Sequence, residues 1–262
     1  MSDGMQTTIE SAFRLDGRVA LVTGGSRGIG AAIAEAFAAA GAAVAVNYVA
    51  GEQAARNVAE RIVAANGRAI TVQGDVADLS AHARMLDTAE ASFGTVDILV
   101  NNAGIETRTG CLDVAPEEWD RQMNVNLRGA FFLAQEASRR MIAGHLPGRV
   151  INMSSTHETR PKPGSLVYNV SKAGLGMLTK SLALELAPHG ITVNGLIPGA
   201  IRTDMNTEVL SDKAYEAKVI GRIPAGWIAA PQDCVSAALF LAGNGARYVT
   251  GTSVAVDGGL ML

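Results

Sequence analysis

The chain has 262 residues, of which 48% are hydrophobic and 18% are charged, and its formal net charge is −3. This composition fits a packed globular protein and argues against a fibrous or disordered one. The small negative charge, without a dense run of lysine or arginine, gives nucleic acid and anionic membranes little to bind. Neither kind of partner is expected.

The N-terminal residues 1–10 lack the basic region and the following apolar stretch of a secretion signal. No later segment reaches the roughly 18 consecutive apolar residues of a membrane span. We therefore expect a cytoplasmic protein. Cys111 and Cys234 lack the spacing of a metal site or a redox pair, so neither a metal nor a disulfide scaffold is expected.

Short apolar runs alternate with alanine-rich segments along the chain. Six runs are expected to form strands, at residues 19–22, 43–46, 69–72, 96–100, 149–152 and 191–194. Continuous apolar runs fit strands buried on both faces, and helical crossovers between them imply a parallel sheet. We predict a single doubly wound α/β domain at residues 15–262, with helices on both faces of the sheet, behind a flexible tail at residues 1–14.

The first predicted strand runs directly into residues 23–30, T-G-G-S-R-G-I-G, and then into a helical segment. Glycines in this position let the backbone approach a pyrophosphate, whose charge is stabilised by the free N–H groups at the start of the helix. The spacing through Gly24, Gly28 and Gly30 is G-x-x-x-G-x-G rather than the general G-x-G-x-x-G. The context predicts a Rossmann-type dinucleotide site that also includes Ser26 and Ile29.

The choice of dinucleotide depends on the end of the second strand, at Asn47 and Tyr48. An acidic residue would normally bind the adenosine ribose of NAD there, and the sequence has none. Arg27 in the glycine loop can instead pair with the 2′-phosphate of NADP. We favour NADP, with Asn47 and Tyr48 near the cofactor. NAD remains possible, since Arg27 could be a solvated charge and Glu52 could reach the ribose.

Two further loops follow predicted strands at the edge where a parallel sheet binds its ligand. Residues 74–76 include Asp75, a candidate acceptor for the adenine amino group, followed by Val76. Residues 101–104 read N-N-A-G, and this loop can support the central strand and the cofactor through its amides. A plain turn is the alternative for that loop. The expected cofactor contacts here are Asp75, Val76, Asn102, Ala103 and Gly104.

Tyr168 and Lys172 are four residues apart in a predicted helix, so their side chains project to the same side. Ionising a tyrosine at pH 7 costs roughly 4 kcal/mol. A lysine cation about 4 Å away, at an effective dielectric constant near 20, contributes on the order of 4 kcal/mol in the opposite direction. The pair therefore predicts a tyrosine that can act as an acid and a base.

Two other polar residues complete the expected reaction centre. Ser155 follows a predicted strand, where its hydroxyl can hold the reacting oxygen, and Ser154 is the nearest alternative. Asn126 can use its side chain or a locally disturbed helix to bind a water that links Lys172 to solvent. Asn124 is the alternative to Asn126.

The T-G-x-x-x-G-x-G, N-N-A-G, Ser, Y-x-x-x-K and P-G elements resemble, in order and spacing, those of classical short-chain dehydrogenases/reductases, from about residue 16 to 260. The resemblance implies an NAD(P)-dependent oxidoreductase in which Tyr168 is the acid/base and Lys172 also binds the nicotinamide ribose. It implies a catalytic tetrad of Asn126, Ser155, Tyr168 and Lys172. It also implies contacts to the nicotinamide from Pro198, Gly199, Ile201 and Thr203.

Residues 102–106, 153–158, 182–188 and 198–201 resemble the glucose 1-dehydrogenase branch of that family. This implies oxidation of an aldose at its anomeric carbon to a lactone. Glu106 and His157 would bind sugar hydroxyls beside Ser155 and Tyr168, unless they are ordinary polar loop residues. Residues 202–225 are expected to form a lid over the substrate.

Positive charges near the expected pocket, at Arg108, Arg160 and Lys162, leave two readings open: an acidic sugar, or solvated loop charges. A second enzyme hypothesis is an NADPH-dependent reductase of 3-oxoacyl thioesters or ketones. For that hypothesis, Arg139 and Arg140 could contact an acidic carrier protein or could simply lie on an exposed helix face.

A non-catalytic cofactor-binding sensor is the third hypothesis, and the complete tetrad argues against it. Segments 248–251 and 254–259 resemble the subunit contacts of the family. The resemblance therefore implies a homotetramer that acts on a small-molecule substrate.

Overall fold

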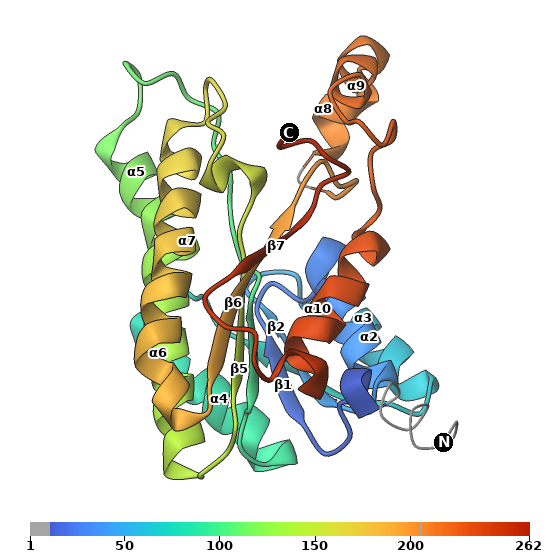
Figure 1. The fold of residues 1–262 in the computed structure, drawn as a ribbon, viewed down its shortest axis with the longest axis vertical. Helices are drawn as coiled ribbons and strands as arrows, with labels where there is room; N and C mark the ends of the chain where they lie inside the picture. Colours follow the sequence, from blue (N-terminus) through green and yellow to red (C-terminus); the bar gives the residue numbers. More distant parts are fainter. Residues whose placement is uncertain (1–10, 205) are drawn as a thin grey trace.

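The computed structural model describes residues 11–204 and 206–262, in which a parallel sheet is flanked by helices (Figure 1). The strands are β1 (Val19–Val22), β2 (Ala43–Tyr48), β3 (Arg68–Gln73), β4 (Ile98–Asn101), β5 (Arg149–Met153), β6 (Thr192–Pro198) and β7 (Ser253–Val256). The α-helices are α2 (Gly28–Ala39), α3 (Glu52–Ala64), α4 (Leu79–Phe93), α5 (Pro116–Met123), α6 (Ala130–Ala143), α7 (Leu166–Leu186), α8 (Thr207–Ser211), α9 (Lys213–Ile220) and α10 (Val235–Ala242). A π-helix spans Asn124–Gly129, and one of the short 3-10 helices spans Thr156–Glu158.

The strand order is β3-β2-β1-β4-β5-β6-β7, and every neighbouring pair is parallel. The order reverses between β1 and β4, which opens a crevice at the carboxyl ends of these strands. The predicted doubly wound α/β fold is thus confirmed, and each of the six predicted runs overlaps a strand. The seventh strand, β7, lies outside those runs because it is a short, half-exposed edge strand with only three consecutive apolar residues.

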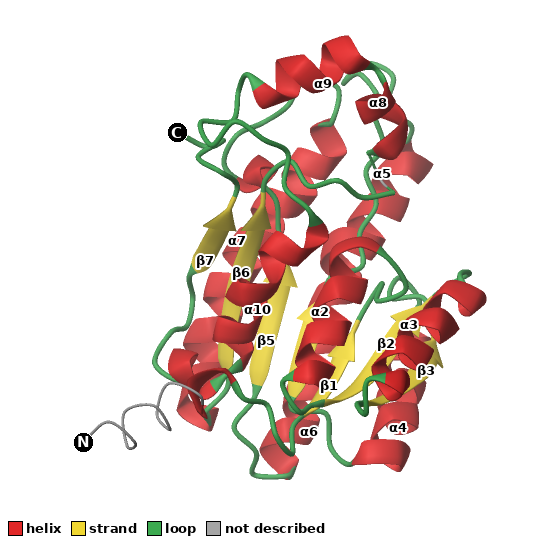
Figure 2. Cartoon of the chain, turned by 90° about the vertical axis from the view of Figure 1, so that its right-hand side faces the viewer, coloured by secondary structure: helices red, strands yellow, loops and turns green. Residues whose placement is uncertain are grey.

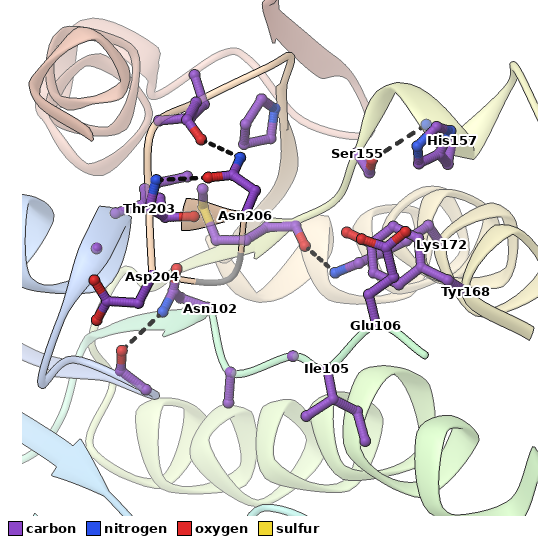
Figure 3. Close-up of a pocket in the computed structure, with 18 of the residues that line it drawn as sticks. Asn102, Ile105, Glu106, Ser155, His157, Tyr168, Lys172, Thr203, Asp204 and Asn206 are labelled. Atoms are coloured by element: carbon purple, nitrogen blue, oxygen red, sulfur yellow. Dashed lines mark hydrogen bonds between the residues drawn. The ribbon is translucent and has the colours of Figure 1, made fainter. Parts of the chain in front are cut away.

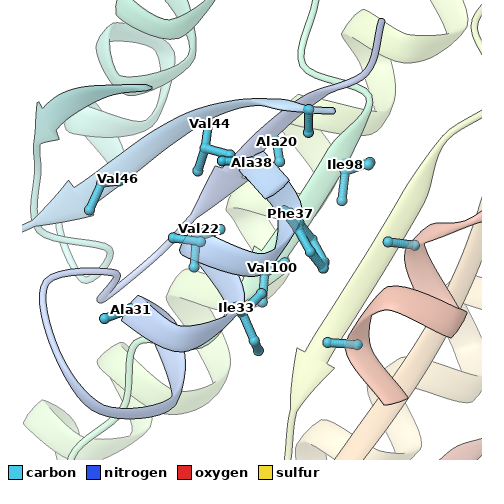
Figure 4. Packing of buried hydrophobic residues seen from close by; sticks show 14 of the residues in the cluster. Ala20, Val22, Ala31, Ile33, Phe37, Ala38, Val44, Val46, Ile98 and Val100 are labelled. Atoms are coloured by element: carbon cyan, nitrogen blue, oxygen red, sulfur yellow. The ribbon is translucent and has the colours of Figure 1, made fainter. Parts of the chain in front are cut away.

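Helices cover both faces of the sheet (Figure 2). Alternate side chains of the central strands enter two cores between the sheet and these helices. In β1, Ala20 and Val22 pack with α2 and α10, whereas Val19 and Leu21 pack with α4 and α6. Phe37 from α2 is wholly buried in the first of these cores (Figure 4). Burial on both faces explains why these strands are continuous apolar runs.

A buried polar chain fixes helix α7, which carries the predicted tyrosine and lysine, against the sheet. Asn101 at the end of β4 donates to Asn152 Oδ1 at 2.9 Å, and Asn152 donates to Thr179 Oγ1 on α7 at 2.9 Å. Thr179 in turn donates to the Leu175 carbonyl at 2.8 Å. Since each donor in this chain has a partner, α7 is held in register with the strands it covers.

Helices α8 and α9 stand beyond the carboxyl ends of the strands (Figure 1). They have a small apolar cluster of their own, centred on Leu210, Ile223 and Ile228, which is separate from the two cores of the sheet. The lid expected at residues 202–225 contains both helices, apart from residue 205, which lies outside the described residues. Movement of this segment over the crevice stays a prediction.

The tail expected at residues 1–14 falls mostly outside the described residues, which begin at residue 11. Residues 11–13 are helical, and the Ala12 carbonyl lies where a side chain at Gly243 would be. The end of the expected tail is therefore packed on the domain. Within residues 11–204 and 206–262, no helix is long and apolar enough to cross a membrane. The cytoplasmic location stays a prediction.

Replacing Asn152 with alanine should destabilise the fold, because Asn101 and Thr179 would lose a buried partner. An unsatisfied buried group costs about 1–3 kcal/mol, so we expect the free energy of unfolding to fall by about 2 kcal/mol. Urea denaturation measures this change. The control is Asn57→Ala, which removes an exposed partner of Gln53 and should change stability by less than about 0.5 kcal/mol. Equal effects of the two variants would contradict the role of the buried chain.

Candidate active site

A cavity of about 1200 Å³ runs from the glycine loop to α9, along the carboxyl ends of the strands (Figure 3). It brings together almost all of the residues expected at the site. Its lining includes the expected cofactor residues Gly24, Ser26, Arg27, Gly28, Ile29, Gly30, Tyr48, Asp75, Val76, Asn102, Ala103, Gly104, Pro198, Gly199, Ile201 and Thr203. It also includes Glu106, Ser155, His157, Tyr168 and Lys172. Of the expected site residues, Asn47 and Asn126 do not line it.

The glycine loop has the shape that a bound pyrophosphate requires. Gly24 and Gly28 have φ angles of 59° and 56°, which favour glycine. A Cβ atom at Gly30 would lie 2.5 Å from Asn102 Nδ2, so only glycine fits between the loop and the neighbouring strand end. Helix α2 begins at Gly28 without a side-chain cap, which leaves its first N–H groups facing the cavity for an anion.

Asn47 supports this loop from below instead of reaching a cofactor. It is 1% exposed, its Oδ1 accepts from Gly24 N at 3.2 Å, and its Nδ2 donates to the carbonyls of Val72 and Gly74 at 3.1 and 2.9 Å. All of its side-chain polar atoms are thus used inside the protein. The expected contact between the Asn47 side chain and the cofactor is wrong, and the next residue, Tyr48, lines the cavity.

The cavity lining near the expected 2′-phosphate position includes the positively charged Arg27. Arg27 is exposed at the cavity edge, with its Nε 3.7 Å from Asp204 Oδ2. Glu52, the alternative ribose ligand, accepts with its Oε1 from Nη2 and Nε of Arg56 at 2.5 and 3.0 Å on the surface of α3, and does not line the cavity. The cavity wall after β2 therefore lacks an acidic side chain.

The N-N-A-G loop joins two strand ends. The backbone N–H of Asn102 donates to Thr23 Oγ1 at 2.9 Å. The Asn102 side chain donates through Nδ2 to the carbonyls of Thr23 and Gly24 at 2.8 and 3.1 Å. On the adenine side, Asp75 Oδ1 accepts from Ala77 N at 2.8 Å. These bonds give the predicted loop its supporting role at the strand ends, as Figure 3 shows for Asn102.

The loop after β6 connects the two halves of the cavity. Asn206 donates to the Ile201 carbonyl at 2.5 Å and accepts from Thr203 N at 2.9 Å (Figure 3). The Thr203 side chain lies close to Gly28 of the glycine loop. Asn206 itself lines the cavity and was not expected there. An asparagine that hydrogen-bonds to backbone nearby is a common turn signal, but only the folded loop shows that it faces the site.

Asn126 lies in the π-helix between α5 and α6, so the locally disturbed helix expected at this position is present. Its Oδ1 accepts from Ile105 N at 2.8 Å, and its Nδ2 donates to the Ile105 carbonyl at 2.9 Å and to Ser171 Oγ at 3.1 Å. Asn126 therefore holds the segment after β4 against α7, next to Lys172. Its alternative, Asn124, does line the cavity.

Ser155 caps the 3-10 helix at Thr156–Glu158, with its hydroxyl accepting from His157 N at 3.2 Å (Figure 3). The Ser155 side chain also acts on Tyr168, whose pKa it lowers against the larger effect of burial. The alternative, Ser154, is buried, and its Oγ has no hydrogen-bond partner among the described residues. Ser155, and not Ser154, is therefore the serine that interacts with Tyr168.

Burial controls the charges of the tyrosine and the lysine. It raises the pKa of Tyr168 to about 12, against a smaller lowering by the hydrogen bond to Ser155. It also lowers the pKa of Lys172 to about 8, against the opposing charge of Glu158. At neutral pH, Tyr168 is therefore a phenol and most of Lys172 is an ammonium.

The compensation expected between these two residues is an upper guide, because the lysine was expected to be offset from the phenolic oxygen and to act together with an oxidised nicotinamide. The side chains show this offset. Lys172 Nζ donates to the Met153 carbonyl at 2.7 Å and lies 5.5 Å from the centre of the Tyr168 ring (Figure 3). The cation thus points at a carbonyl and not at the phenolic oxygen, and burial outweighs it. A bound nicotinamide supplies the hydride acceptor or donor and, when oxidised, further positive charge near the tyrosine.

Two acceptors lie beside Tyr168. Glu106 has a side chain that is 12% exposed; its Oε1 accepts from Ser165 Oγ at 2.9 Å. His157 packs edge-on against Tyr168, with 5.8 Å between ring centres. Its Nδ1 is 2.9 Å from the Arg160 carbonyl, which can only accept, so Nδ1 carries the proton. Burial lowers the pKa of His157, which leaves Nε2 as an acceptor at neutral pH.

Comparison with known proteins identifies the family. The family model described as enoyl-(acyl carrier protein) reductase matches residues 24–261. The chain is 45% identical to 3β-hydroxysteroid dehydrogenase 1 of Eggerthella lenta over 248 residues, which cover 95% of each chain. The chain belongs to this family of short-chain dehydrogenases/reductases. It is therefore an NAD(P)-dependent oxidoreductase, which confirms the family and the enzyme class expected from the motifs.

The chain is also similar to proteins that are named as dehydrogenases of a sugar or a sugar acid. The chain is 37% identical to glucose 1-dehydrogenase 2 of Bacillus subtilis over 249 residues, or 95% of this chain and 96% of that protein. A gluconate 5-dehydrogenase from Burkholderia cenocepacia, solved in complex with NADP and tartrate, has a TM-score of 0.91 at 38% identity. That match covers 96% of this chain and 98% of the other.

Glu158 was not expected at the site, yet this carboxylate lies close enough to Lys172 to act on its charge. Its Oε2 is buried without a hydrogen-bond partner among the described residues, and Ser253 donates to its Oε1 at 3.4 Å. The carboxyl group occupies the space that a side chain at Gly176 would fill, one helical turn after Lys172 on α7. A glycine four residues after the lysine is the available sequence signal.

Glu158→Gln should lower the pKa of Lys172, because it removes the negative charge that opposes the effect of burial. The reaction needs the ammonium form, so activity should be lost at a lower pH as the pH rises. We expect the alkaline limb of kcat/KM for carbonyl reduction to move down by about one pH unit, equivalent to about 1.4 kcal/mol. Steady-state rates measured across the pH range test this shift.

The matched control for this experiment is Glu185→Gln, which removes an exposed carboxylate from the same helix. Its pH profile should superimpose on that of the unmodified enzyme. A Glu158→Gln profile with an unshifted alkaline limb would contradict the positioning role, even if the overall rate were lower.

Proposed function

We propose that the enzyme oxidises an aldose at its anomeric carbon to the lactone, with NADP as hydride acceptor. The observation that supports this most directly is the pair of acceptors beside Tyr168. The Glu106 carboxylate and His157 Nε2 can each accept from a sugar hydroxyl while Ser155 and Tyr168 hold the reacting oxygen. Such a lining suits a polyhydroxylated ring better than an apolar substrate.

In this proposal, Tyr168 takes the proton of the anomeric hydroxyl and Ser155 orients the oxygen that loses it. Lys172, an ammonium at neutral pH, favours the phenolate that must form and would contact the nicotinamide ribose. Asn126 hydrogen-bonds to both Ile105 and Ser171, so it holds the segment after β4 next to α7. The water-linked relay expected for Asn126 would use the π-helix in which it lies.

The preference for NADP rests on charge. Arg27 is the cation nearest the glycine loop in the cavity lining, and no acidic side chain stands in the wall after β2. The structure of the 38% identical gluconate 5-dehydrogenase contains NADP, which supports the same choice. A planar guanidinium can bind the 2′-phosphate through two hydrogen bonds.

The reductase of 3-oxoacyl thioesters or ketones is the second candidate, because a 3-oxoacyl (acyl-carrier-protein) reductase from Agrobacterium tumefaciens is similar to this chain, with a TM-score of 0.89 at 35% identity. One expected feature of that function loses support. Arg140, expected to contact a carrier protein, is 20% exposed and pairs with Asp87, Glu90 and Glu136 at 2.7, 2.8 and 3.1 Å. Its charge is thus balanced within the chain.

The proposed reaction is tested by initial rates of nicotinamide reduction, with NADP and NAD in parallel, across a panel of neutral and acidic aldoses. Aldose-dependent reduction with NADP preferred is the expected result. Acetoacetyl thioesters and ketones are offered with NADPH in the reverse direction. Activity confined to that direction would reject the sugar reaction in favour of the reductase.

Tyr168→Phe is the control for catalysis in the same assay. It should lower kcat by about a hundredfold or more, since general acid–base catalysis contributes about 10²–10⁴-fold. Cofactor binding, followed by fluorescence titration, should be retained. If neither the unmodified protein nor Tyr168→Phe turned over any substrate while both bound the cofactor, the result would support the non-catalytic cofactor-binding sensor.

We also propose that the enzyme is a homotetramer. Helix α7 exposes an apolar stripe made of Leu166, Val170, Met177 and Leu184, the last with 81% of its surface exposed. These positions fall on one helix face, and a stripe of this kind on a monomer favours contact with another copy. Light scattering should give four times the chain mass, and Leu184→Glu should reduce it. A monomer in both proteins would reject the proposal.

A further inference from the structure

The half of the cavity that would receive the substrate is strongly cationic. Segments 105–125, 154–163 and 209–222 contribute five positively charged residues to its lining, namely Arg108, Arg121, Arg160, Lys162 and Arg222. The same segments contribute one acidic residue, Glu106. An enclosed surface with one sign of charge attracts ligands of the opposite sign.

Glu106 cannot balance this excess. Arg108 Nε and Lys162 Nζ lie 3.6 and 3.7 Å from the same oxygen, Glu106 Oε1. Arg160 donates to the backbone carbonyl of Leu260. Arg222 has no ion-pair partner within the part of the chain that the structure describes. Two cations thus share one carboxylate, and Arg121, Arg160 and Arg222 have no ion-pair partner among the described residues.

Two of these charges act on one point beside the reaction centre. Burial lowers the pKa of His157, the Arg160 carbonyl and the charge of Glu106 raise it, and the charges of Lys162 and Arg222 lower it. Both cations line the cavity, and they come from different segments, Lys162 from the segment before α7 and Arg222 from the segment after α9. His157 in turn contacts the Tyr168 ring. The positive charges of Lys162 and Arg222 therefore act on the ring that contacts Tyr168, the expected acid/base.

We propose that the substrate carries a carboxylate and that Lys162 and Arg222 bind it beside His157. This inference rests on the proposed aldose oxidation and narrows its substrate class to sugar acids such as uronates. His157 Nε2 would accept from a ring hydroxyl and not bind the anion, because it has no proton at neutral pH. Arg222, with its planar fork, would give the carboxylate its orientation, and Lys162 would add a second charge.

The exposure of Lys162 favours a ligand for this cation, whereas Arg222 is exposed. The Lys162 side chain is only 30% exposed and lies against the cavity, unlike Arg139, which is 67% exposed on the outer surface of α6. A partly desolvated cation that shares its only carboxylate partner gains more from a second anion than a fully solvated one does. A bound carboxylate would supply that anion.

The test compares D-glucuronate with D-glucose, which present the same anomeric centre and differ in having a carboxylate or a hydroxymethyl group at C6. We expect kcat/KM for glucuronate to exceed that for glucose by at least about tenfold at low salt. Arg222→Gln and Lys162→Gln should each reduce this ratio by at least about tenfold. Arg84→Gln, which removes an exposed cation on α4 outside the cavity lining, is the matched control and should leave the ratio unchanged.

Inhibition by gluconate, a sugar acid without an anomeric centre, separates failure of this inference from failure of the proposed reaction. Oxidation of both sugars at equal efficiency, with a ratio that neither variant changes, would overturn the carboxylate subsite while leaving the aldose reaction intact. If neither sugar is oxidised, gluconate is tested against the reductase reaction. Competitive inhibition that Arg222→Gln weakens at least about tenfold would then support the subsite, and lack of inhibition would overturn it.

Discussion

The ammonium group of Lys172 is held inside the protein, where the residue is 4% exposed and donates to the Met153 carbonyl at 2.7 Å. A buried charge is costly unless hydrogen bonds and an opposite charge compensate for it. The end of β5 supplies the carbonyl, and the 3-10 helix that follows supplies the Glu158 carboxylate. The position of α7 against this strand end therefore determines whether the lysine can remain charged. The buried chain through Asn152 fixes that position.

Burial raises the pKa of Tyr168 and lowers the pKa of Lys172. In both residues it therefore favours the neutral form, so neither a phenolate nor an ammonium follows from burial alone. Glu158 restores the charge of the lysine, but Glu106 raises the pKa of the tyrosine still further. The resting site is thus prepared to donate a proton. Accepting one requires additional positive charge beside Tyr168, which an oxidised nicotinamide can bring.

The local sequence predicted the parts of this site that depend on local pattern. Apolar runs located six strands, and the strand, glycine turn and helix order located the glycine loop that lines the cavity, because each feature is encoded by adjacent residues. Asn47 shows the limit of such reasoning. Its position at the end of β2 suggested a ligand contact, but the register of β2 on β3 places its amide against the Val72 and Gly74 carbonyls. That register is a tertiary property.

The same limit applies to charges that meet across the fold. The four-residue spacing of Tyr168 and Lys172 correctly puts both on one side of α7, yet it does not say which acceptor the lysine reaches. The carbonyl of Met153 comes from β5, and its position depends on how the helix packs on the sheet. The role of Glu158 could not be predicted from the sequence for the same reason, since only its packing against Gly176 places its carboxyl group inside the fold.

The division of the molecule into cores explains how one fold can keep its chemistry and change its substrate. The acid/base and the cofactor loop are fixed by the two cores of the sheet, whereas α8 and α9 are held by a small cluster of their own. Substitutions in that cluster can alter the substrate wall without disturbing the register of α7. The proposed carboxylate subsite spans this division, with Lys162 in the segment that leads into α7 and Arg222 next to the Ile223 of the smaller cluster. A bound sugar acid would therefore connect the part of the molecule that performs the reaction with the part that selects the substrate.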